Sequence, residues 1–206
     1  MIKRIIFDLD NTLIITKSFL EPNKKALERV GIFDIEKARL LDYCSDAYEK
    51  EYSSYNRKDF MTFLNKRLNV NLDESFLDIL ADELKQSVPQ NFEAELEVLD
   101  YLSKKYELVV LTNYFSDIQS NRLQAVGALK YFISVLGEEF PKPRKEAYIK
   151  ACGEHKPNEC VMIGDNFEYD VLTPRQFGLS SIWITDKEIS NGKDIINHLG
   201  ELKDIF

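Results

Sequence analysis

The chain alternates short apolar runs with longer stretches in which apolar residues recur every three or four positions. The short, nearly continuous runs predict buried strands at residues 5–7, 108–111, 132–136, 161–163 and 181–184. Helical spacing predicts helices at residues 91–105, 116–127, 143–152 and 171–177, and places residues 195–199 in a terminal helix. The helix at 116–127 opens on the capping-box pattern Ser116-x-x-Gln119 and ends at Gly127. This alternation is typical of an α/β fold in which helices cover both faces of a parallel sheet.

Residues 15–90 interrupt the alternation. They contain no good strand pattern, and four helical patterns can be drawn, at residues 22–30, 35–55, 58–68 and 73–87. The block separates the first strand from the second by far more than a crossover requires. We therefore expect a Rossmann-like core made of residues 1–14 and 91–206, and a helical cap inserted at residues 15–90. The hinges of the cap are expected near residues 13–17 and 88–90.

Composition and charge narrow the class of protein. Hydrophobic residues make up 44% of the 206 positions and charged residues 30%, which is ordinary for a globular protein. The net charge of −8 argues against a broad nucleic-acid or anionic-membrane surface. Three cysteines without metal-type spacing, Cys44, Cys152 and Cys160, suggest free buried thiols in a reducing compartment. With neither a signal peptide nor a membrane span in the pattern, we expect a cytoplasmic protein of open oligomeric state.

The first strand ends in two carboxylates. Asp8 and Asp10 follow the apolar run at residues 5–7, two positions apart, so both can reach one crevice. Burying two like charges together is costly unless something neutralises them. A divalent cation with oxygen ligands, such as Mg²⁺, does this well.

Polar residues also follow the later strands, and ligands of open parallel sheets bind beyond the carboxyl ends of strands. Each residue alone has a plainer interpretation, as a turn, a solvated lysine or a helix cap. Jointly they favour a phosphate bound against a metal ion, because they combine acids, a hydroxyl, an amide and a lysine. The set comprises Thr112, Asn113, Lys142, Asp165, Asn166 and Asp170.

The chain resembles the haloacid dehalogenase-like hydrolase superfamily over nearly its whole length. Asp8-Leu9-Asp10-Asn11-Thr12 is similar to the first motif of that family, Asp-x-Asp-x-Thr. Leu111-Thr112-Asn113 is similar to the second motif, which ends in Thr or Ser, and Lys142 takes the place of the lysine of the third. Gly164-Asp165 followed by Asp170 is similar to the fourth motif, an acid pair with four residues between. The resemblance implies a Rossmann-like core, a requirement for Mg²⁺ and chemistry on phosphate esters.

The resemblance also implies roles for single residues. Asp8 would be the nucleophile and Asp10 the general acid and base. Mg²⁺ would be held by Asp8, the carbonyl oxygen of Asp10, and Asp165. The phosphate would be held by Thr112, Asn113 and Lys142, and the metal and the lysine would be supported from behind by Asp170 and Asn166.

One feature of the chain departs from the family pattern, and the cap adds further candidate residues. Pro174 follows Asp170 where small residues are usual, so the helix at 171–177 is expected to start late or to kink. In the cap, Tyr48, Tyr52 and Tyr55 form a stripe that fits packing of the cap's own core better than a substrate pocket. Arg57 could anchor a substrate or simply begin a solvated helix.

We therefore expect a Mg²⁺-dependent phosphatase that hydrolyses a small phosphomonoester, such as a nucleotide or a sugar phosphate, through an aspartyl-phosphate on Asp8. A phosphotransferase or phosphomutase on the same core, and a non-catalytic binding protein of this fold, stay open as alternatives. A receiver-type signalling module fits poorly because it would lack the cap. A dehalogenase is disfavoured because Asp10 occupies the acid/base position that phosphatases keep.

Overall fold

The computed structural model describes residues 1–16, 18–187 and 194–206. In this part of the chain a six-stranded sheet has the order β3-β2-β1-β4-β5-β6, and every neighbouring pair of strands is parallel. The predicted α/β fold class with a Rossmann-like parallel sheet is therefore confirmed. The strands are β1 Arg4–Phe7, β2 Glu107–Leu111, β3 Ser134–Leu136, β4 Cys160–Gly164, β5 Ser180–Ile184 and β6 Ile195–Ile196.

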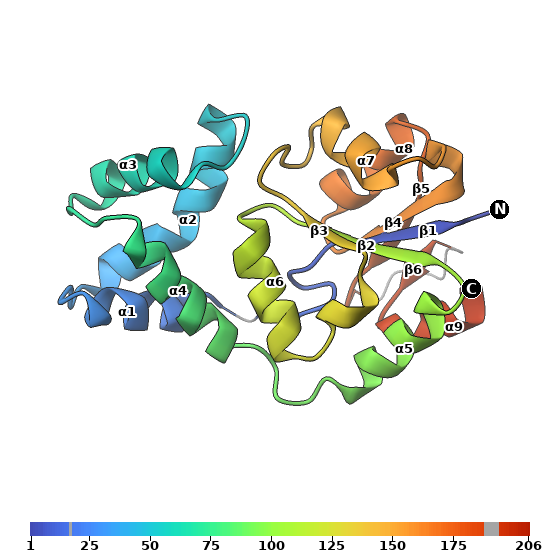
Figure 1. Cartoon of the computed structure of the whole chain (residues 1–206), viewed down its shortest axis with the longest axis horizontal. Helices are drawn as coiled ribbons and strands as arrows, with labels where there is room; N and C mark the ends of the chain where they lie inside the picture. The colour runs from blue at the N-terminus through green and yellow to red at the C-terminus, as the bar shows by residue number, and fades with distance from the viewer. Residues whose placement is uncertain (17, 188–193) are drawn as a thin grey trace.

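Helices cover both faces of the sheet because successive side chains of a strand point to opposite sides. Ile5 and Phe7 of β1 belong to one buried cluster and Ile6 to another. Figure 1 shows one layer of helices on each side of the strands. One layer contains α5 Glu93–Ser103, α6 Ser116–Ala125 and α9 Leu202–Ile205; the other contains α7 Lys145–Cys152 and α8 Thr173–Gln176.

Strand β1 lies in the middle of the sheet, between β2 and β4. Phe7 is in register with Val110 of β2 and with Ile163 of β4. The backbone N–H of Asp8 still donates to the carbonyl of Ile163, at 2.8 Å, so the ladder continues into the first acid. The residues that follow these three strands therefore meet at one edge of the sheet.

Between β1 and β2 the chain forms a helical insertion, and Figure 1 shows it beyond the carboxyl ends of the strands. Its apolar residues make a buried cluster of their own, which continues into α6 through Phe115 and Ile118. Asp34 and Asn56 cap the second and third helices by accepting backbone N–H bonds. The helices are α1 Leu20–Arg29, α2 Ile35–Glu51, α3 Arg57–Leu68 and α4 Ser75–Gln86. Of the expected hinge at residues 13–17, Lys17 lies outside the described residues.

Two elements of the structure differ from their predictions, one in where it ends and the other in its type. Helix α2 stops at Glu51, four positions before the predicted end, because the chain turns extended at Tyr52 and Asn56 begins the next helix. The terminal helix predicted at residues 195–199 is wrong. Ile195 and Ile196 form an edge strand that pairs with β5, and a 3-10 turn begins only at Leu199.

The capping box predicted at Ser116 is also wrong. Phe115 takes the N-cap position without a side-chain bond, and the Ser116 N–H and hydroxyl both donate to the carboxylate of Glu138. Gln119 is thereby free to point elsewhere. A distant acid has replaced the local cap that the pattern suggested.

The helix expected at 171–177 is irregular, as the position of Pro174 suggested. A π-helical turn, Phe167–Leu172, precedes the short α8. Pro174 falls in the first turn of α8, where a missing N–H costs no helical bond. The three cysteines are free and buried, as predicted. None of the described helices is long and apolar enough to cross a membrane.

Candidate active site

The turn after β1 presents both acids of the first motif. Asn11 has a φ of 58°, a left-handed conformation that asparagine tolerates better than most residues. This reverses the chain and lets the N–H groups of Leu13 and Ile14 donate to the Leu9 carbonyl. Asp8 is buried, and the hydroxyl of Thr12 donates to its Oδ2 at 3.2 Å.

Lys142 joins the first motif to the last. Its Nζ lies 2.7 Å from Oδ1 of Asp8 and 2.7 Å from Oδ1 of Asp170. All three side chains are buried, with Asp170 fully inaccessible. Burial alone would lower the pKa of Lys142, but the two carboxylates outweigh it and raise that pKa above its ordinary value. The lysine is therefore a fixed positive charge at the base of the crevice.

The turn after β4 holds Asp170 against this lysine. The backbone N–H of Asn166 donates to Oδ2 of Asp170 at 3.1 Å, and the Asn166 side chain caps the π-helical turn. Gly164 allows the approach, because a Cβ there would lie 2.2 Å from Oδ2 of Asp170. Both oxygens of Asp170 are thus engaged by protein groups.

Three carboxylates gather at this point. Oxygens of Asp8, Asp165 and Asp170 all lie within 4.8 Å of one another. Burial raises the pKa of Asp8 to about 7, with Asp170 adding to the rise and Lys142 opposing it. Burial and the neighbouring Asp8 raise the pKa of Asp165 to about 6. Such a cluster of hard oxygen donors, costly when ionised together, is chemically suited to a divalent cation.

The residues after β2 are held by partners that the sequence did not reveal. The Thr112 hydroxyl is buried and accepts from Nε2 of Gln119 at 3.0 Å. The amide oxygen of Asn113 accepts from the Lys142 backbone N–H at 2.7 Å, and its nitrogen donates to Glu49 of α2 at 2.6 Å. The Asn113 side chain therefore fixes the lysine loop and touches the insertion.

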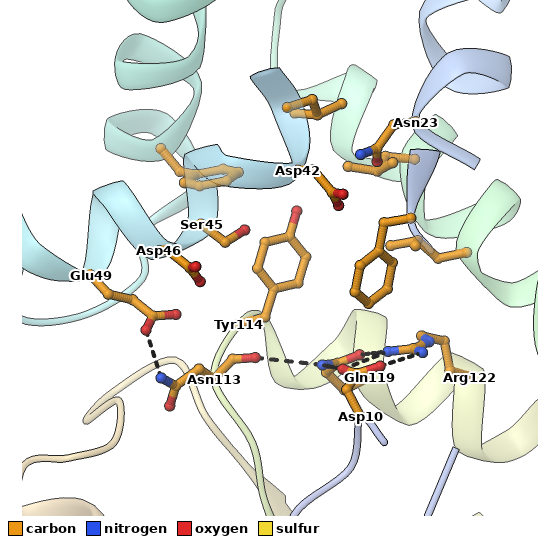
Figure 2. Close-up of a pocket in the computed structure, with 15 residues that line it drawn as sticks. Asp10, Asn23, Asp42, Ser45, Asp46, Glu49, Asn113, Tyr114, Gln119 and Arg122 are labelled. Atoms are coloured by element: carbon orange, nitrogen blue, oxygen red, sulfur yellow. Dashed lines mark hydrogen bonds and ion pairs between the residues drawn. The ribbon is translucent and has the colours of Figure 1, made fainter. Parts of the chain in front are cut away.

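The carboxylate of Asp10 turns away from Asp8 toward helix α6. Arg122 donates to it through both terminal nitrogens, at 3.0 and 2.7 Å, and the Thr16 hydroxyl donates at 2.8 Å. Figure 2 shows Asp10, Gln119 and Arg122 grouped together beneath Tyr114. Sequence reasoning missed Gln119 and Arg122. Their spacing of three places them on one helical face, but nothing local marks that face as facing the acids.

All eight predicted site residues border one open crevice of about 960 Å³: Asp8, Asp10, Thr112, Asn113, Lys142, Asp165, Asn166 and Asp170. Residues far apart in the sequence are therefore brought together as expected from strand ends. Asp46 and Glu49 of the insertion also line the crevice, and sequence reasoning did not single them out. Trp183 holds Asp165 from the neighbouring strand, since its indole N–H donates to the Asp165 carbonyl at 2.8 Å.

The candidates inside the insertion are occupied by packing and ion pairs. Tyr48 and Tyr55 are buried, and Tyr52 stacks on Tyr48 with ring centroids 4.2 Å apart. The packing interpretation is confirmed for Tyr48 and Tyr55, which belong to the buried cluster of the insertion, whereas Tyr52 is 37% exposed. Tyr52 and Tyr55 lie beyond the end of α2. Arg57 pairs with Asp78 of α4 and with Asp117 of α6, and so ties the insertion to the core.

Comparison with known proteins decides the family. The model of the haloacid dehalogenase-like (HAD-like) hydrolases matches residues 2–178. The chain belongs to this family. The resemblance stated from the four motifs is therefore confirmed, and the match spans β1, the insertion and every strand end that carries a predicted site residue.

Individual relatives of this HAD-like hydrolase agree on the chemistry. PpaX of Clostridium perfringens, named provisionally as a pyrophosphatase, is 28% identical over 86% of this chain and 81% of its own length. The pyrimidine 5′-nucleotidase YjjG of Escherichia coli is 27% identical over 87% of this chain and 84% of its own. Other relatives are named as phosphatases of glyceraldehyde 3-phosphate and phosphoglycolate. The protein is accordingly an enzyme that acts on phosphate esters, a phosphatase of this superfamily.

Solved structures show the same fold. YfnB of Bacillus subtilis, determined with bound magnesium, superposes with a TM-score of 0.71 at 19% identity. The alignment covers 99% of this chain and 98% of that one, so the helical insertion is part of the shared architecture.

Proposed function

We propose that this phosphatase hydrolyses a small phosphomonoester in a Mg²⁺-dependent reaction that passes through an aspartyl-phosphate on Asp8. The observation that carries the proposal is the position of Lys142. It is buried, 2.7 Å from both Asp8 and Asp170, at the base of a crevice that Asp165 also borders. A nucleophile, a fixed cation and a cluster of oxygen donors are thus present at one point, as phosphoryl transfer needs.

The residues present suit a magnesium ion. Asp8 and Asp165 have raised pKa values that a neighbouring cation would lower, and the Asp10 carbonyl oxygen would complete a hard-oxygen set. Asp170 would support the site from behind, because both of its oxygens already accept hydrogen bonds. Bound Mg²⁺ would neutralise charge on the carboxylates and on the phosphate oxygens. YfnB, which shares this fold, was determined with bound magnesium, and this supports Mg²⁺ as the ion.

In the proposed reaction, different side chains act as nucleophile, as general acid and base, and as phosphate ligands. A carboxylate oxygen of Asp8 attacks phosphorus, and the bond from phosphorus to the alcohol oxygen breaks as the new bond forms. Asp10 gives its proton to the departing alcohol oxygen and afterwards takes one from the water that hydrolyses the aspartyl-phosphate. Lys142, the Thr112 hydroxyl and the Asn113 backbone amide would bind the phosphate oxygens.

We further propose that residues 15–90 act as a cap over a core made of residues 1–14 and 91–206. Several contacts cross between the two parts near the site. The Tyr55 N–H donates to the Glu138 carbonyl at 2.6 Å, Asn113 donates to Glu49, and Arg57 pairs with Asp117. Closing such a cap over the crevice would exclude water and bring its side chains to the leaving group. The free, buried cysteines fit a reducing compartment such as the cytoplasm.

The test is hydrolysis of para-nitrophenyl phosphate with Mg²⁺, with a chelator, and with Mg²⁺ restored. Turnover should vanish and return, and Asp8→Asn should abolish it while keeping the fold, because an amide is a poor nucleophile of the same shape. Acid-quenched wild type should carry a phosphoryl group on Asp8 by mass spectrometry. Asp82→Asn, which removes an exposed acid of α4, serves as the control. Undiminished turnover in chelator, or in Asp8→Asn, would contradict the proposal.

A second candidate reaction, transfer of the phosphoryl group to another alcohol, uses the same groups. It is distinguished by the acceptor. In H₂¹⁸O the proposed phosphatase places ¹⁸O in the released phosphate, whereas a transferase places the phosphoryl group on the second substrate.

A further inference from the structure

A second cavity, of about 190 Å³, opens from the catalytic crevice between α2 and the turn after β2. The cavity and the crevice share four lining residues, Asp10, Asp46, Glu49 and Asn113. If the proposed function holds, a phosphate ester at Asp8 would extend its alcohol part past Asp10 into this cavity. The walls of the cavity would then select that alcohol.

The wall of the cavity on the insertion side is acidic. Asp42, Asp46 and Glu49 are spaced by four and three positions on α2, which puts them on one face. Figure 2 shows Asp42 and Asp46 directed toward the space around Tyr114, and Glu49 beside it, bonded to Asn113. Among the described residues, Arg122 is the single cationic residue that lines the cavity, and both of its terminal nitrogens are bound to Asp10. Its charge is therefore committed to Asp10 and does not balance the acids of α2.

Glu49 also borders the catalytic crevice, and its surroundings disfavour the ionised form of its carboxyl group. Burial raises the pKa of Glu49, although the Tyr55 hydroxyl and the Asn113 amide both donate hydrogen bonds to it. Asp42 and Asp46 stand at the solvent-accessible mouth of the same cavity. A positive group entering here would meet three carboxylates on one wall and would be attracted to each of them.

An unpartnered donor lies on the opposite wall. Arg122 is 1% exposed, and its Nε has no hydrogen-bond partner among the described residues. Buried donors are normally satisfied, so a ligand oxygen seated against Arg122 would complete its hydrogen bonding. Apolar side chains, including Phe60 and Leu80, line the remainder, and the Tyr114 ring stands between the two polar walls in Figure 2.

We infer that the leaving group is a small alcohol that carries a protonated amino group and a further hydroxyl, so that the substrate is the phosphate ester of an amino alcohol or amino sugar. The ammonium would lie against Asp42, Asp46 and Glu49, and the hydroxyl oxygen would accept from Arg122. A second phosphate or a carboxylate in that place would be repelled by the same wall.

The charge preference is tested with three phosphomonoesters that differ in one terminal group: 2-aminoethyl, 2-hydroxyethyl and carboxymethyl phosphate. At pH 7 with Mg²⁺, kcat/KM should fall roughly tenfold at each step from ammonium to hydroxyl to carboxylate, about the effect of one charge pair. Glucosamine 6-phosphate should likewise exceed glucose 6-phosphate.

Variants of the acidic residues of α2 test whether these residues cause the preference for the amino ester. In the double variant Asp42→Asn with Asp46→Asn, the preference for the amino ester over the hydroxyl ester should fall about tenfold. Asp82→Asn, which removes a charge from the insertion away from the cavity, should keep the wild-type preference. Calorimetric binding of the same esters to the inactive Asp8→Asn protein gives the preference independently of turnover.

The outcomes separate the two proposals. If the hydroxyl or carboxymethyl ester is preferred, or if the double variant keeps the amino preference, the inference about the leaving group is overturned while phosphatase activity stands. If none of these esters nor para-nitrophenyl phosphate is hydrolysed with Mg²⁺, the proposed function is overturned and the inference with it.

Discussion

Arg122 donates hydrogen bonds from both terminal nitrogens to the carboxylate of Asp10, at 3.0 and 2.7 Å, although the two residues are 112 positions apart in the sequence. The guanidinium is buried, and it also donates to the side-chain oxygen of Gln119 at 2.8 Å. Gln119 in turn reaches Thr112. A single helical face of α6 thus orients the proposed acid/base and a proposed phosphate ligand together.

Arg122→Lys should lower kcat for para-nitrophenyl phosphate by roughly tenfold with little change in KM. Lysine keeps the charge but cannot form the two parallel hydrogen bonds that fix the Asp10 carboxylate. Steady-state kinetics on folded protein, checked by circular dichroism, provides the measurement.

A double-mutant cycle shows whether this effect passes through Asp10. In an Asp10→Asn background, Arg122→Lys should cost almost nothing further, because the group it orients is already gone. An equal loss in both backgrounds would mean that Arg122 acts by another route.

The candidate active site at the edge of the sheet could be predicted because its sequence signals are local and because the parallel sheet fixes where the strand ends lie. An apolar run followed by polar residues marks a strand end, and parallel strands bring such ends together. Asp8, Thr112, Lys142 and Asp165 were found in this way, and they border one crevice. The fold class followed from the same alternation.

The contacts supplied by α6 and α2 could not be predicted in the same way. Ser116 and Gln119 looked like a capping box, yet Glu138 bonds Ser116 and Gln119 turns to the active site. Ile195 and Ile196 fit a helical stripe, but pairing with β5 makes them an edge strand. Tertiary contacts decided each case, and a two-residue strand is too short for periodicity to identify.

Gly164→Ala should destabilise the protein by about 1–3 kcal/mol, the usual cost of overpacking a filled site. The new Cβ would lie 2.2 Å from Oδ2 of Asp170, so the carboxylate must move, and its ion pair with Lys142 weakens. Urea unfolding and para-nitrophenyl phosphate turnover should both show a loss.

Gly31→Ala is the matched control for this substitution. Gly31 has a φ of 80°, so alanine is strained there too, but no heavy atom of the described residues lies within 4 Å of the added carbon. It should lower stability while leaving turnover per folded molecule unchanged. Gly164→Ala with wild-type kcat would show that the position of Asp170 does not matter for the reaction.

Lys142→Met should reduce kcat/KM on the order of a hundredfold for every phosphomonoester, because the proposed site sets the lysine against the phosphoryl group that all of them share. Lys145→Met, an exposed change nearby, should have no comparable effect. A loss confined to one ester would instead place Lys142 in contact with the leaving group.

The same substitution should cost stability in a pH-dependent way. It leaves Asp8 and Asp170 buried without their cation, and breaking a buried pair costs about 3–5 kcal/mol. The loss should be largest at pH 8 and smaller at pH 5, where the raised pKa of Asp8, about 7, lets it take up a proton. Urea unfolding at the two pH values measures the difference.

Stabilisation by Mg²⁺ should be large at pH 8 and nearly absent at pH 5. The pKa values of Asp8 and Asp165 are raised from 3.8 to about 7 and about 6, so between about pH 4 and 7 the folded protein binds more protons than the unfolded chain. Without metal, stability therefore falls as the pH rises through this window and levels off above it. Mg²⁺ needs the ionised carboxylates and must displace those protons, so its binding strengthens over the same range.

Thermal unfolding in Mg²⁺ and in chelator, at pH 5, 6, 7 and 8, measures this linkage. At a Mg²⁺ concentration one hundred times Kd the gain is about 2.7 kcal/mol, which a thermal melt resolves readily. Asp165→Asn should remove most of the gain at pH 8, whereas Asp82→Asn should keep it, since Asp82 is exposed on α4. A gain of equal size at pH 5 and pH 8 would mean that the ion binds away from these carboxylates, and the assignment of Asp8 and Asp165 as its ligands would fail.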